Sequence, residues 1–217
     1  MLLAIASQIG QLLLFGAVLV SLWAAATVAV CALTRIKLKK ITIFVGKPVF
    51  TFQTPLCPLC IGYIPTTAYV SHDTDDFVTH PLPVRWLMIL AGPLAVVLSA
   101  VACLGAQETA AQMHSALAQL SQGALHPLTR GASLVARFFE LAHHSLIAGY
   151  GTLAAKSATL YILPIPAMPL GQMLIDLLPN RHEHRLVKVL SPILAFLLFP
   201  LFISWAIALI SHLCHVR

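Results

Sequence analysis

Three prolines within six residues, Pro164, Pro166 and Pro169, interrupt a long apolar stretch in the second half of the chain. Each proline removes a backbone N–H donor and clashes with the preceding helical turn, so this stretch cannot be one continuous helix. At membrane depth, the carbonyl groups that lose their donors need partners from protein or trapped water. We therefore expect residues 163–172 to line a protein interior or a cavity, although they include no Asp, Glu, His or Cys.

The composition is that of a membrane protein. Of the 217 residues, 59% are hydrophobic and 9% are charged, and the mean hydropathy is +0.90. Soluble domains have about 25% charged residues. The formal charge of +6 lies beside apolar segments, which favours a role in membrane topology over nucleic-acid binding. We predict an α-helical integral membrane protein with about four transmembrane helices and a small membrane-dipping β-hairpin or sheet between the first two.

The apolar runs divide one predicted membrane domain, residues 1–217, into segments. We expect a first span at 9–34, a β-hairpin region at 41–70 and a second span at 84–106. These are followed by an amphipathic segment on the outer face at 107–143, a third span with the proline-rich break at 145–178, and a fourth span at 189–213. Basic residues follow the first span and precede the fourth, at 35–47 and 181–188. This asymmetry predicts a multi-pass protein of a bacterial inner membrane with both termini on the periplasmic side.

Two features outside the break could carry chemistry. Cys57 and Cys60 have the spacing of half a zinc site or of a redox dithiol, and the alternative is that they are structural or incidental. Lys156 lies inside the third apolar run, where a lysine costs about 2.5–3.5 kcal/mol at a helix centre. Such a charge either faces inward toward a partner or extends to the membrane interface.

Three motifs, taken in order, resemble those of the site-2 protease family of intramembrane zinc metalloproteases. They are IPTTAYV at 64–70, AGPLAV at 91–96 and YILPIPAMPLG at 161–171. They correspond to the family's I-P-x-G-G-Y-V, A-G-P-x-A-N and N-x-x-P-x-P-x-L-D-G-G motifs. HPL at 126–128 resembles the family's G-P-I. The resemblance covers most of the chain and implies the family's fold, with a β-hairpin beside which a substrate binds as an extended strand.

The polar residues of these motifs are missing from this chain. The spacing places the family's H-E-x-x-H zinc site at residues 23–27. Trp23 and Thr27 stand at the positions of the two histidines, and Ala24 stands at the position of the glutamate. Pro169 stands for the aspartate ligand, and Val96 and Tyr161 stand for the two asparagines. The resemblance therefore implies no catalytic residues, no metal and no cofactor. We expect Trp23 to fill the space of the lost site.

These departures predict a pseudoprotease rather than an enzyme. The expected role is to bind other integral membrane proteins in the lipid bilayer, as a scaffold or a subunit of a membrane complex, with no nucleic-acid partner. The candidate partner-binding residues are the hairpin residues Thr51 and Phe52, together with Gly149, Gly151 and Lys156 of the third run. The alternatives are an intramembrane enzyme with relocated metal or thiol chemistry at Cys57 and Cys60, and an accessory subunit of a transporter or channel.

Overall fold

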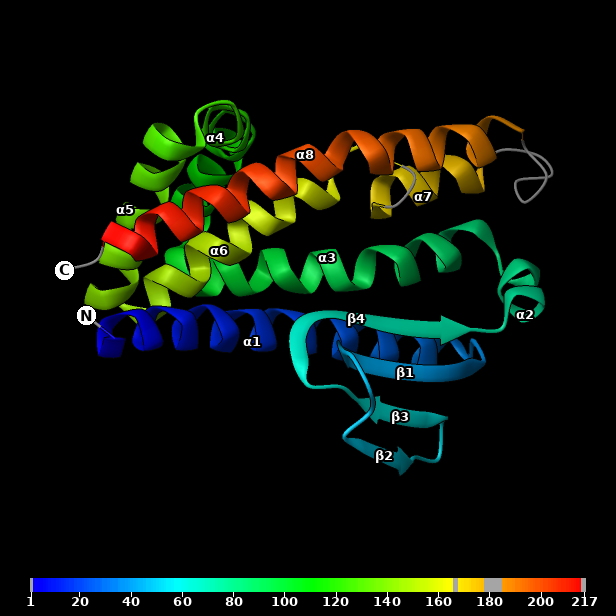
Figure 1. The fold of residues 1–217 in the computed structure, drawn as a ribbon. Coiled ribbons are helices and arrows are strands. Elements are labelled where there is room, and N and C mark those ends of the chain that lie inside the picture. Colours follow the sequence, from blue (N-terminus) through cyan, green and yellow to red (C-terminus); the bar gives the residue numbers. More distant parts are fainter. Residues whose placement is uncertain (1, 166–167, 178–184, 216–217) are drawn as a thin grey trace. The chain divides into compact units, whose positions relative to one another are not determined.

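The computed structural model describes residues 2–165, 168–177 and 185–215 (Figure 1). Helices predominate, and four strands lie between the first two long helices. In chain order the elements are α1 (Leu2–Thr34), β1 (Leu38–Val45), β2 (Phe50–Gln53), β3 (Pro58–Ile61), β4 (Ile64–His72), α2 (Thr74–Thr79), α3 (Leu82–Leu104), α4 (Ala106–Leu125), the π-helical turn η1 (Pro127–Gly131), α5 (Ala132–His144), α6 (Leu146–Tyr161), α7 (Pro169–Asp176) and α8 (Arg185–His215).

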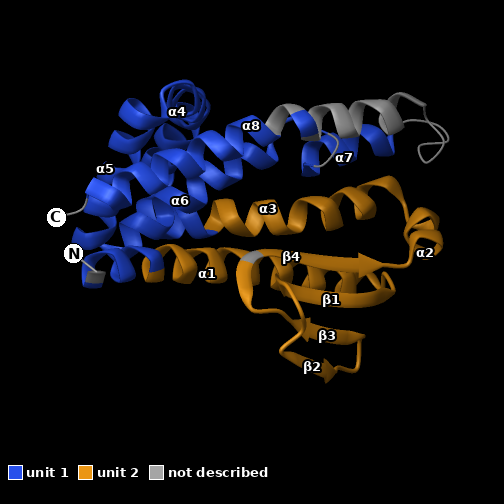
Figure 2. Cartoon of the chain, viewed as in Figure 1, with its two compact units in different colours: residues 1–9, 99–217 blue, residues 10–98 orange. Residues whose placement is uncertain are grey.

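The chain forms two compact units (Figure 2). One unit comprises residues 10–98, which include most of α1, the four strands, α2 and most of α3. The other comprises residues 1–9 and 99–217, with α4 to α8. Because α1 and α3 each contribute to both units, the division does not follow a linker between domains. A single membrane domain over residues 1–217 stays a prediction.

Among the described residues, two helices are long and apolar enough to cross a membrane, judged by length and composition. They are α1, over Leu3–Thr34, and α3, over Leu82–Leu104. The predicted third span is divided, because α6 has 16 residues and ends at Tyr161, before the prolines. In α8 the apolar part found among the described residues is the shorter stretch Phe199–His215. The count of four spans and the orientation of the termini stay predictions.

The sheet has the strand order β2-β3-β1-β4. The sequence predicts an antiparallel sheet or hairpin here, and two of the three pairings, β2–β3 and β1–β4, are antiparallel. The pairing of β1 with β3 is parallel, which the prediction missed. The turn at Gly46 does not return the chain onto β1, because β3 occupies the place beside β1 and β2 lies at the edge. Gly46 has a φ of +110°, a conformation that favours glycine.

The predicted break around the prolines is present in the residues on either side of Pro166 and Ala167. Residues 162–165 are not helical, and α7 begins with Pro169 as its first residue. A proline suits this position because the first helical N–H has no partner within the helix. Pro166, Ala167 and the first half of the predicted inner basic loop, residues 181–184 of 181–188, lie outside the described residues. The predicted amphipathic segment at 107–143 contains α4, η1 and α5, and its location on the outer face stays a prediction.

Candidate functional site

The positions matched to the lost zinc site lie on the buried side of α1. Ala24 and Thr27 are buried, and Trp23 is half-buried. They continue a stripe of buried side chains at helical spacing along α1, whose other members are Phe15, Leu19, Val20 and Cys31. The Thr27 hydroxyl Oγ1 donates a hydrogen bond to the Trp23 carbonyl, 3.0 Å away. The Thr27 hydroxyl is therefore bonded to a backbone carbonyl of its own helix.

The Trp23 indole lies directly on Gly92 of α3. A Cβ atom added at Gly92 would come within 2.2 Å of the indole Nε1 and 2.3 Å of Cδ1. Because Gly92 has no side chain, the indole ring can pack directly against the backbone of α3. Trp, Ala and Thr in this arrangement offer no histidine or carboxylate, so these residues do not fit a zinc ion of the kind that site-2 proteases bind.

The remaining positions matched to the family's polar residues are Val96, Tyr161 and Pro169. Val96 on α3 is fully buried. Tyr161 is the last residue of α6 and is half-buried, and Pro169 is the buried first residue of α7. Val96 belongs to the unit of residues 10–98, whereas Tyr161 and Pro169 belong to the other unit. Asp176, which the sequence analysis did not consider, is a buried carboxyl at the end of α7. Its place just after the proline motif was the sequence feature that could have indicated Asp176 as a candidate site residue.

The strand β2 is an open edge of the sheet. All four of its residues are exposed, and it pairs only with β3. Phe50 and Phe52 lie on one face of the strand with their ring centroids 6.2 Å apart, and they are 58% and 50% exposed. The other edge strand, β4, is approached by α1, since a Cβ at Gly16 would lie 2.9 Å from the Pro65 carbonyl oxygen. The predicted contact residues Thr51 and Phe52 are therefore on the exposed edge.

Cys57 and Cys60 are both free thiols and both buried. Burial raises the pKa of the Cys57 thiol, although a hydrogen bond with the Ile41 backbone opposes this shift. A raised pKa lowers the fraction of reactive thiolate at neutral pH. Thr51 Oγ1 lies 3.9 Å from Cys60 Sγ, as a weak donor to the sulfur. Among the described residues, no group of three or more His, Cys, Asp or Glu side chains is arranged to hold a metal ion.

The predicted contact residues of α6 lie in a packed region. Gly149 and Gly151 are buried, and a Cβ at Gly151 would come within 2.7 Å of Leu104 Cγ and 2.8 Å of Cys103 Cβ. The small size of Gly151 thus serves a contact within the chain. Lys156 is half-buried, and its Nζ donates a hydrogen bond to Gln119 Oε1 of α4 at 2.5 Å. Gln119 was not singled out from the sequence, because no local pattern links residues so far apart.

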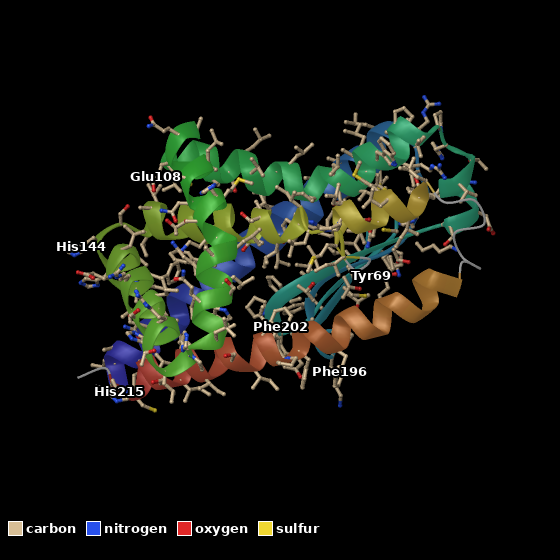
Figure 3. All side chains as sticks on the ribbon, turned by 90° about the horizontal axis from the view of Figure 1, so that it is seen from above. Tyr69, Glu108, His144, Phe196, Phe202 and His215 are labelled. Carbon is tan, nitrogen blue, oxygen red and sulfur yellow. The ribbon has the colours of Figure 1, made fainter. Side chains whose placement is uncertain are left out.

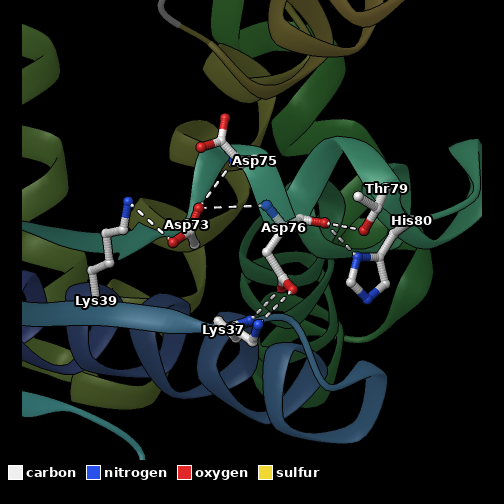
Figure 4. Close-up of polar contacts among 7 residues, drawn as sticks. All are labelled: Lys37, Lys39, Asp73, Asp75, Asp76, Thr79 and His80. Atoms are coloured by element: carbon white, nitrogen blue, oxygen red, sulfur yellow. Dashed lines mark hydrogen bonds and ion pairs between the residues drawn. The ribbon is translucent and has the colours of Figure 1, made fainter.

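A second polar cluster, also missed from the sequence, joins β1 to α2 (Figure 4). Lys37 pairs with Asp76 through Nζ and Oδ1 at 3.5 Å, and the Lys37 backbone N–H donates to Asp76 Oδ2 at 2.9 Å. Lys39 Nζ lies 3.3 Å from Asp73 Oδ2. Asp73 also caps α2 by accepting hydrogen bonds from the backbone N–H groups of Asp75 and Asp76. These contacts hold the connection between the sheet and α3.

The hydrogen bonds of this cluster lower the pKa values of both carboxyls. For Asp73, the backbone N–H of Asp76 is the largest cause and the Lys39 side chain is next. For Asp76, the backbone N–H of Lys37 is the largest cause. The cluster is a structural clasp, since each charge has a partner within the chain.

Comparison with known proteins gives no family for this chain. No protein-family model matches it, and no curated protein matches it. The resemblance to site-2 proteases therefore rests on the sequence motifs and their order alone.

Proposed function

We propose that this chain is a catalytically inactive, site-2-protease-like membrane protein that binds another membrane protein. Two apolar helices of membrane-spanning length support the membrane location. The replacement of the zinc ligands and the general base by Trp23, Ala24, Thr27 and Pro169 supports the absence of proteolysis. Its role is then that of a scaffold or a subunit in a membrane complex, and its partner contributes an extended segment that adds to the sheet.

The open edge at β2 is the observation that carries this proposal. Exposed edge strands present unpaired backbone donors and acceptors, and proteins usually protect them with charges, prolines or bulges. The β2 sequence FTFQ contains no charge and no proline, and its two phenylalanines are exposed. An edge of this kind favours addition of a partner strand, whose backbone would bind β2 while its side chains contact the phenylalanine pair.

The test uses proline substitutions at two consecutive positions of β2, Thr51→Pro and Phe52→Pro. Backbone N–H groups alternate in direction along a strand, so one of these residues donates toward β3 and the other toward the open edge. We expect the outward-facing variant to keep the sheet but to lose the partners that co-purify with the wild-type protein. Hydrogen exchange of the β3 amides reports whether the sheet is intact.

Thr51→Val and Phe52→Tyr are the matched controls, because they keep the N–H group, the strand preference and the aromatic ring at position 52. Both should retain the partners. If both proline variants keep an intact sheet and every partner, the β2 edge is not the contact. The substitution Gly151→Leu is unsuitable as a partner test, because the added side chain would collide with Cys103 and Leu104 inside the chain.

A further inference from the structure

Two polar side chains of α6 contact α4. Lys156 and Thr159 are three residues apart, which places them on one side of the helix. Thr159 Oγ1 lies 3.2 Å from the Met113 carbonyl oxygen, and Lys156 Nζ lies 2.5 Å from Gln119 Oε1. These two contacts join the helices within the unit of residues 1–9 and 99–217. Lys156 is the only Lys or Arg residue in either helix.

The Lys156 charge is hydrogen-bonded but not neutralised by the described part of the chain. Gln119 is uncharged, and Lys156 takes no part in the Lys37–Asp76 and Lys39–Asp73 ion pairs. Glu108, the acidic residue of α4, lies in the first turn of that helix (Figure 3). Its Oε1 accepts a hydrogen bond from Gln112 Nε2 at 2.8 Å. Glu108 is about three helical turns from Gln119, too far to pair with Lys156.

The Lys156–Gln119 pair has more donors than acceptors, because its one acceptor atom, Gln119 Oε1, already accepts a bond from Lys156. An ammonium has three N–H donors, of which one is directed to Gln119 Oε1. The Gln119 amide oxygen accepts this bond, which leaves its NH₂ group as a further donor. The complementary group is an anion with more than one acceptor oxygen. Ionisable groups in membrane segments usually pair with one another, so a single cation fits a single carboxylate.

A lipid phosphate fits this arrangement less well. Recognition of anionic headgroups typically uses clusters of several Lys or Arg residues. Neither α4 nor α6 has another Lys or Arg besides Lys156, and the neighbouring donors belong to the Gln119 amide. The number and kind of donors therefore favour a carboxylate.

We propose that Lys156 and Gln119 receive one Asp or Glu carboxylate from an apolar segment of a partner membrane protein. The ammonium supplies the charge, and the amide NH₂ of Gln119 supplies a second hydrogen bond. This inference rests on the proposed function and adds to it a second contact with a defined chemistry.

The test uses two probe peptides with the purified full-length chain in phosphatidylcholine vesicles. Each peptide is a leucine–alanine helix of about 20 residues, long enough to span the bilayer, with either Glu or Gln at its centre. Binding is measured by energy transfer at about pH 8, because membrane burial raises the pKa of a carboxyl group. We expect the wild-type chain to bind the Glu peptide about 3- to 15-fold more tightly than the Gln peptide.

Three variants separate charge from packing. Lys156→Arg keeps the cation and should keep the preference for Glu. Lys156→Gln keeps a polar side chain beside Gln119 but removes the charge, so the preference should disappear. Gln119→Glu supplies a carboxylate from within the chain, and it should also abolish the preference although Lys156 is unchanged. The Gln119→Glu variant keeps the packing between α4 and α6 and gains an ion pair, which guards against misfolding.

Equal binding of the two peptides by the wild-type chain, or no detectable binding of the Glu peptide, would overturn this proposal. So would an unchanged preference in Lys156→Gln. If phosphatidylglycerol in the vesicles removes the preference for Glu, the pair takes a lipid phosphate and the carboxylate assignment is wrong. Each of these failures is distinguishable from a failure of the proposed function, which is tested separately by partner loss in the β2 variants.

Discussion

At the scale of single residues, the contact between Trp23 and Gly92 is the most tightly defined feature of the degenerate site. The indole occupies space that any side chain at position 92 would need, since an added Cβ would lie 2.2 Å from Nε1. A glycine within α3 lowers helix preference by about 1 kcal/mol relative to alanine. The glycine is nevertheless needed at this position, because any larger side chain would collide with the tryptophan ring.

We predict that Gly92→Ala destabilises the protein and that Trp23→Ala largely relieves this effect. The single Gly92→Ala change forces the indole or α3 to move, at a cost of about 1–3 kcal/mol for overpacking. Trp23→Ala alone should cost about 1.5–3 kcal/mol, because the side chain is half-buried. In the double variant the clash is absent, so the two effects should not add. Reversible unfolding in mixed micelles measures all three.

Gly10→Ala is the matched control for the glycine substitution. Gly10 lies in α1 with nothing within 4 Å of an added Cβ. Alanine there should be neutral or slightly stabilising through its helix preference. Additive losses in the Gly92→Ala/Trp23→Ala variant would contradict the packing described for the indole.

At the scale of elements, the clasp between β1 and α2 responds to pH. Asp73 and Asp76 have pKa values below that of an unfolded aspartate, about 3.9. Their contribution to stability is therefore fully present above the unfolded pKa. It is lost as the pH falls through the lower folded values, because both carboxyls must then take up protons. We expect α2 to open in mild acid, below about pH 4.

Hydrogen exchange of the peptide covering α2, corrected for the intrinsic pH dependence of exchange, measures this opening. Asp73→Ala and Asp76→Ala should show faster exchange already at neutral pH, because the cap and the Lys37 contacts are lost. Asp75→Ala serves as the control, because Asp75 contributes its backbone N–H to the cap and no side-chain bond to the cluster (Figure 4). An Asp75→Ala variant that opens as readily as the other two would show that the clasp does not hold the helix.

At the scale of the whole molecule, the proposed replacement of the zinc ligands and the general base predicts an absence of proteolysis. We expect the purified protein with added zinc not to cleave transmembrane substrates. Trp23→His alone should not create activity, because Ala24 and Pro169 still lack the general base and the third ligand. Cleavage is followed by mass spectrometry of a reconstituted substrate. A cleavage product that a chelator suppresses would contradict the pseudoprotease proposal.

Much of this protein could be inferred from the sequence, because the relevant forces act locally. The apolar runs over α1 and α3 and the strand residues within 38–72 follow from composition and residue preference. The helix break follows from Pro164 and Pro169, because proline lacks the N–H group of the helical hydrogen bond and clashes with the preceding turn. The absence of zinc ligands at the positions matched to the site-2 protease motifs rests on side-chain chemistry alone, and it stays a prediction.

Only the tertiary structure decided which distant residues meet. The place of β3 between β1 and β2 depends on pairing across the chain, which local preference does not specify. The same holds for the indole on Gly92, the Lys37–Asp76 pair and the bond from Lys156 to Gln119. Each contact joins residues far apart in sequence, and its partner is selected by packing and by the need to satisfy buried polar groups. The exposed edge of β2 has the same origin, because a strand becomes an edge only when the sheet is complete.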